Sequence, residues 1–322
     1  MKKFIYMISL AGLIFLNGCD DSFNPKSEFQ EKFVLSSIIQ GSNRGLNIGV
    51  DVYLTKLYNV DGTNPYTNPD DPAVKNAVVQ FLHRDKVYDL QLTTIEDGNP
   101  RYNSDMFLYS TSVVSPRAGD SVYVRAILPD GTRLSSSIQF PRSLHFELNY
   151  PYVRGYTSNI DQSAFGDALN FSWKGALEEL YFPELVLNYQ QLIDGKWVSK
   201  RVNVPSEILP NGTKVYPEYV YDFEMGFKYD AIDRTVASLG EGLENKSEIK
   251  LVSLYFKLES FERNLANYYS STNGFLDSYS IRLDEEVFMN IAGGLGIFGA
   301  SIAYDEELEF DPGYVASYGY SN

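Results

Sequence analysis

The sequence is poor in the side chains from which most metal and redox sites are built. Its 322 residues include one cysteine and two histidines. A single thiol excludes an internal disulfide framework, a cysteine-ligated zinc site and an iron–sulfur cluster. Basic residues are also few, because 27 lysines and arginines stand against 42 aspartates and glutamates. The net charge of -15 repels phosphate backbones, and we therefore expect no nucleic-acid partner.

Long apolar runs are missing as well, apart from one at the N-terminus. The run over residues 4–16 follows two lysines and is too short to span a bilayer core of about 30 Å comfortably. It predicts a secretory signal peptide over residues 1–18. The tetrapeptide Leu16-Asn17-Gly18-Cys19 resembles a bacterial lipoprotein signal and contains the only cysteine of the chain. We expect Cys19 to carry several acyl chains, which together make a stable membrane anchor.

The residues after this cysteine indicate where in the cell envelope the protein is located. Asp20 and Asp21 follow it directly, and acidic residues in this place resemble the surface-export signals of Bacteroidetes lipoproteins. A solvated tether has the same character, and residues 22–32 are mostly polar. We expect an outer-membrane protein held by an acylated cysteine and a polar tether over residues 19–32. It would face either the cell surface or the periplasm.

Aromatic residues are abundant, with 25 tyrosines and 20 phenylalanines, and they favour strands. Residues 46–54 alternate apolar and polar side chains, which is the pattern of a half-buried strand. Residues 77–92 predict a hairpin, and Pro129-Asp130-Gly131 predicts a turn between two further strands. Short alternating strands at this spacing predict an immunoglobulin-like or transthyretin-like β-sandwich over residues 33–141.

Residues 142–322 predict a second β-rich domain with one amphipathic helix. Asp194-Gly195 is a strong turn signal and predicts a long hairpin between residues 181–193 and 197–204. Ser260 resembles a helix N-cap. An apolar stripe at helical spacing then predicts a helix near 260–273; it consists of Phe261, Leu265, Tyr268 and Tyr269.

One glycine-rich motif invites a cofactor interpretation. Residues 294–299, Gly-Leu-Gly-Ile-Phe-Gly, match the G-x-G-x-x-G pattern of dinucleotide sites. Such a site needs a helix and a second parallel strand after the motif, and the 23 residues that follow leave no room for them. We therefore expect no cofactor and a structural role in close backbone packing. This glycine block consists of Gly293, Gly294, Gly296 and Gly299.

Other candidate sites have plain alternatives. Asp61, Asp70 and Asp71 lie in one loop whose oxygen ligands suit calcium, although solvated turn residues have the same composition. His83 and His145 are not in a zinc-binding spacing. No G-x-S-x-G elbow is present, and a glycosidase carboxylate pair cannot be identified from sequence because its geometry is spatial. The two tryptophans could be sugar-stacking platforms or core residues; they are Trp173 and Trp197.

Four elements together carry a family resemblance. They are the lipoprotein signal, the strand sequence Gly-Asp-Ser-Val-Tyr-Val-Arg-Ala at 119–126, a strand–helix step around residues 253–269, and the block Asn-Ile-Ala-Gly-Gly-Leu-Gly-Ile-Phe-Gly at 290–299. With these the chain resembles a Bacteroidetes outer-membrane lipoprotein family that is catalogued as a domain of unknown function. Members are often encoded near TonB-dependent receptors, and the family offers no established catalytic residues.

The resemblance implies a non-enzymatic accessory binding protein beside an outer-membrane transporter. Two alternatives remain open. One is a surface protein that binds or hydrolyses glycans, for which a cleft with two carboxylates about 5–10 Å apart would speak. The other is a structural or adhesive surface protein, which a large exposed tyrosine patch would favour.

Overall fold

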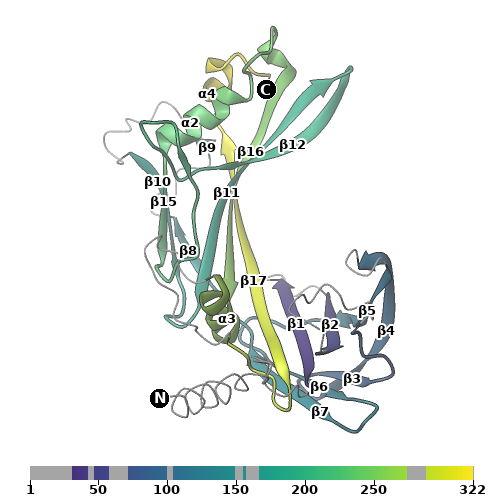
Figure 1. The fold of residues 1–322 in the computed structure, drawn as a ribbon. Coiled ribbons are helices and arrows are strands. Elements are labelled where there is room, and N and C mark those ends of the chain that lie inside the picture. Colours follow the sequence, from purple (N-terminus) through teal and green to yellow (C-terminus); the bar gives the residue numbers. More distant parts are fainter. Residues whose placement is uncertain are drawn as a thin grey trace, which may run out of the picture.

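A computed structural model describes residues 31–42, 47–57, 72–99, 104–148, 155–156, 167–273 and 288–321. The fold is mainly β, which confirms the predicted class (Figure 1). Within these ranges no helix is both long enough and apolar enough to cross a membrane.

The N-terminal part is built from strands that follow the predicted alternation. Along residues 121–127 every second side chain is buried, and the same holds for residues 50–54. Gly131 has a φ of +86° in the predicted turn, a conformation that glycine adopts without strain. The strands are β1 (Phe33–Ser42), β2 (Ile48–Lys56), β3 (Val78–His83), β4 (Lys86–Asn99), β5 (Ser104–Val114), β6 (Ser121–Ile127) and β7 (Arg133–Gln139).

Strand β4 turns this part into two layers. Residues 86–90 pair with β3, and residues from Gln91 onward pair with β5. The strand order β1-β2-β5-β4-β3-β6-β7 therefore bends over at β4, which is consistent with a β-sandwich. The buried faces meet in a common core that includes Leu35, Val52, Phe81, Val124 and Leu134.

Four long strands form the spine of the molecule. They are β11 (Leu180–Ile193), β12 (Lys196–Val204), β16 (Ile249–Phe261) and β17 (Leu295–Phe310), and the short β9 (Gly155–Tyr156) pairs with β17. The predicted hairpin of β11 and β12 is confirmed, with Asp194 and Gly195 both at positive φ. Along the spine the strand order is β12-β11-β16-β17.

The C-terminal strand β17 joins the two parts. It pairs parallel with β1 from Val34↔Leu295 to Ser42↔Ala303. It also pairs antiparallel with β16 from Phe261↔Ser301 to Leu254↔Leu308. Across the described parts of the chain, one 12-stranded sheet and one main core therefore continue from the N-terminal strands to the spine. The division of the chain at 141/142 is not matched by a division of the sheet.

A second layer covers one face of the spine. It is a three-stranded sheet of β8 (His145–Leu148), β10 (Ala168–Lys174) and β15 (Glu224–Lys228) in the order β15-β10-β8. Its aromatic rings pack on those of the spine. Phe171 stacks on Phe256 with ring centroids 3.8 Å apart, and the ring centroids of Trp173 and Tyr181 are 5.6 Å apart. Trp173 is thus a core residue. A two-stranded ribbon of β13 (Glu207–Ile208) and β14 (Lys214–Val215) follows the long hairpin.

The predicted helix is present as α3 (Arg263–Asn273), but its start differs from the prediction. Ser260 belongs to strand β16, and the side chain of Glu262 caps the helix by accepting hydrogen bonds from the backbone N–H groups of Asn264 and Leu265. Ser260 instead donates to a buried carboxylate, which holds it in the strand.

Among the described residues two further α-helices were not predicted, α2 (Tyr229–Ser238) and α4 (Pro312–Ser317). Helix α2 buries Ala231, Ile232, Thr235 and Val236 on one face. This spacing of apolar residues is helical. The segment directly follows a Tyr-rich stretch that favours strands, and for this reason the helix was not predicted. The short η4 (Lys246–Glu248) leads into β16.

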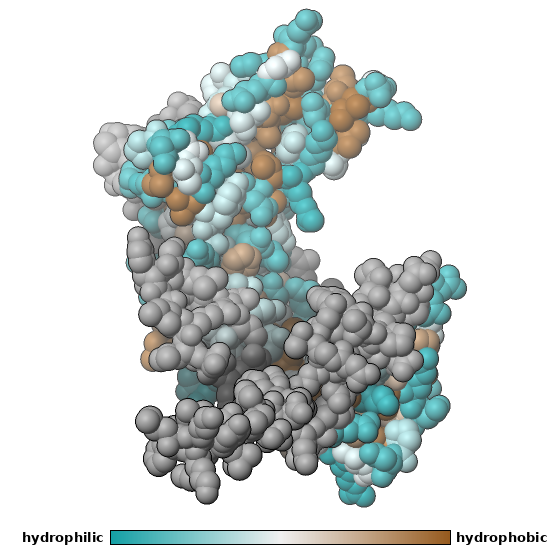
Figure 2. Space-filling model, viewed as in Figure 1, coloured by the Kyte–Doolittle hydropathy of each residue, from teal (hydrophilic) through white to brown (hydrophobic). Residues whose placement is uncertain are grey.

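The molecule is elongated and hollowed on one side (Figure 2). The β11–β12 hairpin, called the arm below, projects at one end of the spine, and the N-terminal strands lie at the other (Figure 1). Helices α2 and α4 lie at the same end as the arm, and α3 packs on β17 near the opposite end.

Candidate binding sites

The glycine block lies where β17 passes between its neighbours. Gly296 has a φ of +113°, and a Cβ at this position would lie 2.0 Å from the backbone oxygen of Leu35. Gly293 has a φ of +83°, and its Cβ would lie 2.2 Å from the backbone oxygen of Arg133. Both positions therefore require glycine, because a side chain would be strained and would also collide with backbone.

The other two glycines of the block meet similar crowding. A Cβ at Gly294 would lie 2.7 Å from the backbone oxygen of Phe33, and one at Gly299 would lie 2.9 Å from Cβ of Leu265 in α3. After the block the chain continues as strand β17 to Phe310. A dinucleotide loop would pass instead into a helix whose N-terminus receives the pyrophosphate. The geometry is that of close backbone packing.

A small polar cavity of about 250 Å³ lies at the junction of the two parts. Its lining includes two buried carboxylates, Glu179 and Glu262, and two exposed arginines, Arg142 and Arg263. Sequence could not single out these glutamates, because nothing local marks them as buried. Two carboxylates in one cavity raise the question of glycosidase chemistry.

The hydrogen bonds of these carboxylates are structural. Glu179 accepts from the backbone N–H of Arg142 and from the hydroxyls of Tyr181 and Ser260, which ties the two parts together. Glu262 is committed to capping α3. Burial raises the pKa of Glu262 to about 7, and it also raises the pKa of Tyr181. Because these oxygens are already bonded within the protein, the cavity is better explained as a joint than as a hydrolytic centre.

His83 belongs to a polar cluster at the end of β3. Its Nε2 lies 2.8 Å from Oδ2 of Asp120, and the same oxygen accepts hydrogen bonds from Arg84 and from the backbone N–H of Arg117. Partial burial opposes ionisation of Asp120, but these donors outweigh it and lower its pKa. His145 begins strand β8, where it pairs with Lys174. Within the described ranges no three His, Cys, Asp or Glu residues are grouped as metal ligands.

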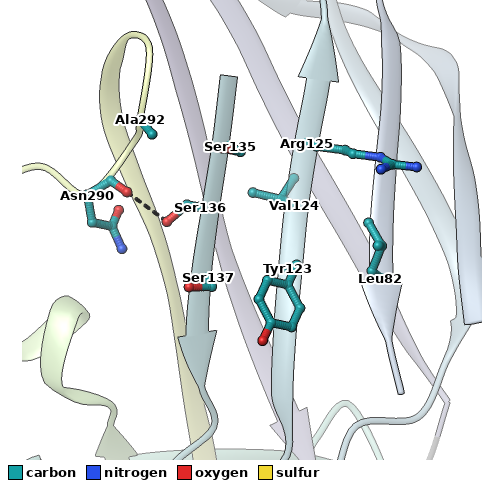
Figure 3. A pocket seen from close by; sticks show the side chains of 9 residues that line it. All are labelled: Leu82, Tyr123, Val124, Arg125, Ser135, Ser136, Ser137, Asn290 and Ala292. Atoms are coloured by element: carbon teal, nitrogen blue, oxygen red, sulfur yellow. Dashed lines mark hydrogen bonds between the residues drawn. The ribbon is translucent and has the colours of Figure 1, made fainter. Parts of the chain in front are cut away.

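A larger hollow lies on the N-terminal sheet (Figure 3). Its volume is about 470 Å³, within the range of small-molecule sites. It lies over β3, β6 and β7 and is bordered by the segment that precedes the glycine block. That segment bonds to β7 through Ala292 and Ser135, and the Ser136 hydroxyl donates to the carbonyl of Asn290. The lining residues are Leu82, Tyr123, Val124, Arg125, Ser135, Ser136, Ser137, Asn290 and Ala292.

The solvent-facing side chains of this hollow come from alternate positions of paired strands. Tyr123 pairs with Ser137, and Arg125 pairs with Ser135, so all four lie on one exposed face. Tyr123 is 51% exposed. The sequence signal was available, because Tyr123 and Arg125 are the polar positions of a strand whose alternation was recognised. Their neighbours in space were not predictable from that strand alone.

The arm carries the second tryptophan. Trp197 is 45% exposed, unlike the buried Trp173, and two further apolar side chains near the turn are also exposed, Ile193 and Val198. Strand β12 pairs with β11 on one side and, as the last strand of the sheet path, has no strand partner among the described residues on the other. This edge offers unpaired backbone groups to another chain.

Several predicted site residues lie outside the residues that the structure describes. They are Cys19 and the calcium candidates Asp61, Asp70 and Asp71. Their roles stay predictions. Comparison with known proteins adds no assignment, because no protein-family model matches the chain and no curated protein matches it significantly.

Proposed function

We propose that this protein is a non-enzymatic lipoprotein of the outer membrane that binds a TonB-dependent transporter as an accessory subunit. The observation that carries the proposal is the arm, a long hairpin that projects from the end of the molecule opposite to the start of β1. The lipoprotein signal and the family resemblance supply the location and the class of partner.

The pairing registers indicate how far the arm lies from the membrane tether. The tether leads into β1 at Phe33, next to the Val34↔Leu295 pair. From Leu295 the ladder runs up β17 to Leu308, along β16 to Ile249, and finally along β11 to Ile193 at the hairpin turn. This path covers about 20 residues, or about 65 Å at about 3.3 Å per residue. A random coil of 14 residues, the length of the predicted tether over residues 19–32, has an r.m.s. length of about 20 Å.

The chemistry of the arm suits a protein partner. Strand β12 contains Lys196, Lys200 and Arg201 and no acidic residue, although the chain as a whole is strongly acidic. Trp197 and Val198 add exposed apolar surface to the same strand. A basic strand with a free edge can receive an acidic extended segment as an additional strand, in which backbone hydrogen bonds provide affinity and opposite charges favour the correct partner.

The test is co-purification of the lipidated protein from its native outer membrane. We expect a barrel transporter to co-purify with the parent protein. The double variant Trp197→Ser/Arg201→Glu removes the aromatic contact and reverses a charge on the arm, so it should lose the transporter. The matched control is Lys214→Glu/Tyr216→Ser, which makes similar changes at exposed residues of the β13–β14 ribbon.

Two results would contradict the proposal. One is that no transporter co-purifies with the parent protein. The other is that the arm variant and the ribbon variant retain equal amounts of transporter, since the arm would then not be the contact. A glycan-binding role is the second candidate, and the specific observation that favours it is the hollow beside Tyr123.

A further inference from the structure

We propose that the hollow on the N-terminal sheet binds a pyranose ring of a neutral glycan, with Tyr123 as its stacking platform. This site is separate from the arm and uses none of its residues. The inference rests on one aromatic face, one ordered guanidinium and two hydroxyl groups that share the exposed side of β6 and β7.

The aromatic platform comes first. Tyr123 projects from the solvent side of β6, and its ring is seen nearly face-on in Figure 3. Tyr123 is 51% exposed, so about half of its surface is open to solvent. The C–H groups on one side of a pyranose form a flat apolar patch, which leaves water favourably when it is placed on an aromatic face.

An ordered cation lies on the same exposed face, where the Arg125 side chain extends from β6 over β3 (Figure 3). Nε of Arg125 donates to Oε1 of Gln80 at 2.6 Å, and Nε2 of Gln80 donates to Oδ1 of Asp89 at 2.6 Å. This row of side chains across β4, β3 and β6 restrains the guanidinium. Within the described part of the chain its two Nη groups have no hydrogen-bond partner, so they can donate a pair of parallel bonds to vicinal hydroxyls of a sugar.

Small hydroxyl side chains complete the lining. Ser135 and Ser137 lie opposite Arg125 and Tyr123 on β7, and a serine hydroxyl can both donate and accept. Ser136 is already bonded to the carbonyl of Asn290, and the Asn290 amide is bonded to the backbone of Phe298. These contacts fix the border of the hollow, and the two other serines remain for a ligand.

Charge decides which glycan suits the site. The lining contains one cation and no carboxylate, but the whole protein carries a net charge of -15. A polyanionic glycan would be repelled by the protein as it approached. A neutral sugar experiences no such repulsion and still satisfies Arg125 through its hydroxyls. We expect a dissociation constant in the millimolar range for one sugar unit, because a monosaccharide has only about a dozen non-hydrogen atoms.

The experiment is native affinity electrophoresis of the mature lipidated protein in non-ionic detergent. The gels contain arabinoxylan, galactomannan, mixed-linkage β-glucan or dextran as neutral probes and polygalacturonate as the anionic probe. We expect at least one neutral polymer to retard the parent protein and polygalacturonate not to retard it. Tyr123→Ala should weaken this retardation by at least tenfold in apparent dissociation constant, whereas Tyr123→Phe should retain it.

Two controls separate the site from general effects. Tyr216→Ala removes a tyrosine of similar exposure, 45%, outside the hollow and should leave retardation unchanged. The arm variant Trp197→Ser/Arg201→Glu should also leave it unchanged, so that loss of transporter binding and loss of glycan binding are distinguishable. Retardation by none of the neutral polymers would overturn the proposal. Equal retardation of the parent protein and the Tyr123→Ala variant would overturn it as well.

Discussion

Replacement of Gly296 by alanine should destabilise the protein far more than a glycine substitution of similar backbone conformation elsewhere. Gly296 combines a φ of +113° with a Cβ position 2.0 Å from the backbone oxygen of Leu35. Gly212 has a φ of +86°, and a Cβ there meets no atom within 4 Å. The Gly212→Ala variant therefore measures backbone strain alone, and the difference between the two variants measures the collision between β17 and β1.

The magnitudes follow from the geometry. An alanine held at positive φ costs about 1–2 kcal/mol, which is the expected effect at Gly212. At Gly296 the strands must also separate by more than about 1 Å, which weakens two or three ladder hydrogen bonds of about 1 kcal/mol each. We expect a total of about 3–5 kcal/mol. With an unfolding entropy of about 2.1 cal/mol/K per residue, this lowers the melting temperature by about 5–8 °C, against about 2–3 °C for Gly212→Ala.

The assay is thermal and urea unfolding of the protein that begins at residue 20, followed by circular dichroism. Equal losses in Gly296→Ala and Gly212→Ala would refute the close approach of the two backbones. Millimolar NAD gives a second readout, since a ligand that binds the folded state raises its melting temperature. We expect no such increase; a reproducible increase that Gly296→Ala abolishes would restore the dinucleotide interpretation.

Three further predictions concern other residues. Because burial raises the pKa of Glu262 from 4.5 to about 7, its contribution to stability is present below pH 4.5 and falls by roughly 3 kcal/mol as the pH rises through 7. Urea unfolding should show this decline at pH 5 to 8 and lose it in Glu262→Gln; a parent–variant difference that is independent of pH would contradict it. The lowered pKa of Asp120 contributes stability above pH 3.8 that is lost as the pH falls, so Asp120→Asn should destabilise at pH 7 and little at pH 3. Cys19→Ala should abolish fatty-acid labelling and release the protein from membranes, and a variant that still floats with membranes would exclude the anchor.

Local sequence patterns were sufficient for most secondary structure. Strand β6 alternates because one face is buried, and the arm turns at Asp194-Gly195 because these residues accept positive φ. Helix α3 was recognisable from its apolar stripe. These features depend on neighbours within a few residues, so they can be read along the chain. Helix α2 was missed because a β-prone stretch runs directly into it.

The candidate sites depend on contacts that no local pattern specifies. Leu295 and Val34 are far apart in the sequence but are paired in the structure. This parallel pairing of β1 and β17 unites the two predicted domains in one sheet. The same pairing explains why Gly296 must lack a side chain. The G-x-G-x-x-G motif by itself could not distinguish this close packing from a cofactor loop. The hollow beside Tyr123 is likewise assembled from a strand, its partner and a segment near residue 290. Sequence therefore determined most of the elements and predicts the anchor at Cys19. The tertiary structure decided which residues meet, because strand pairing brings together positions that share no local signal.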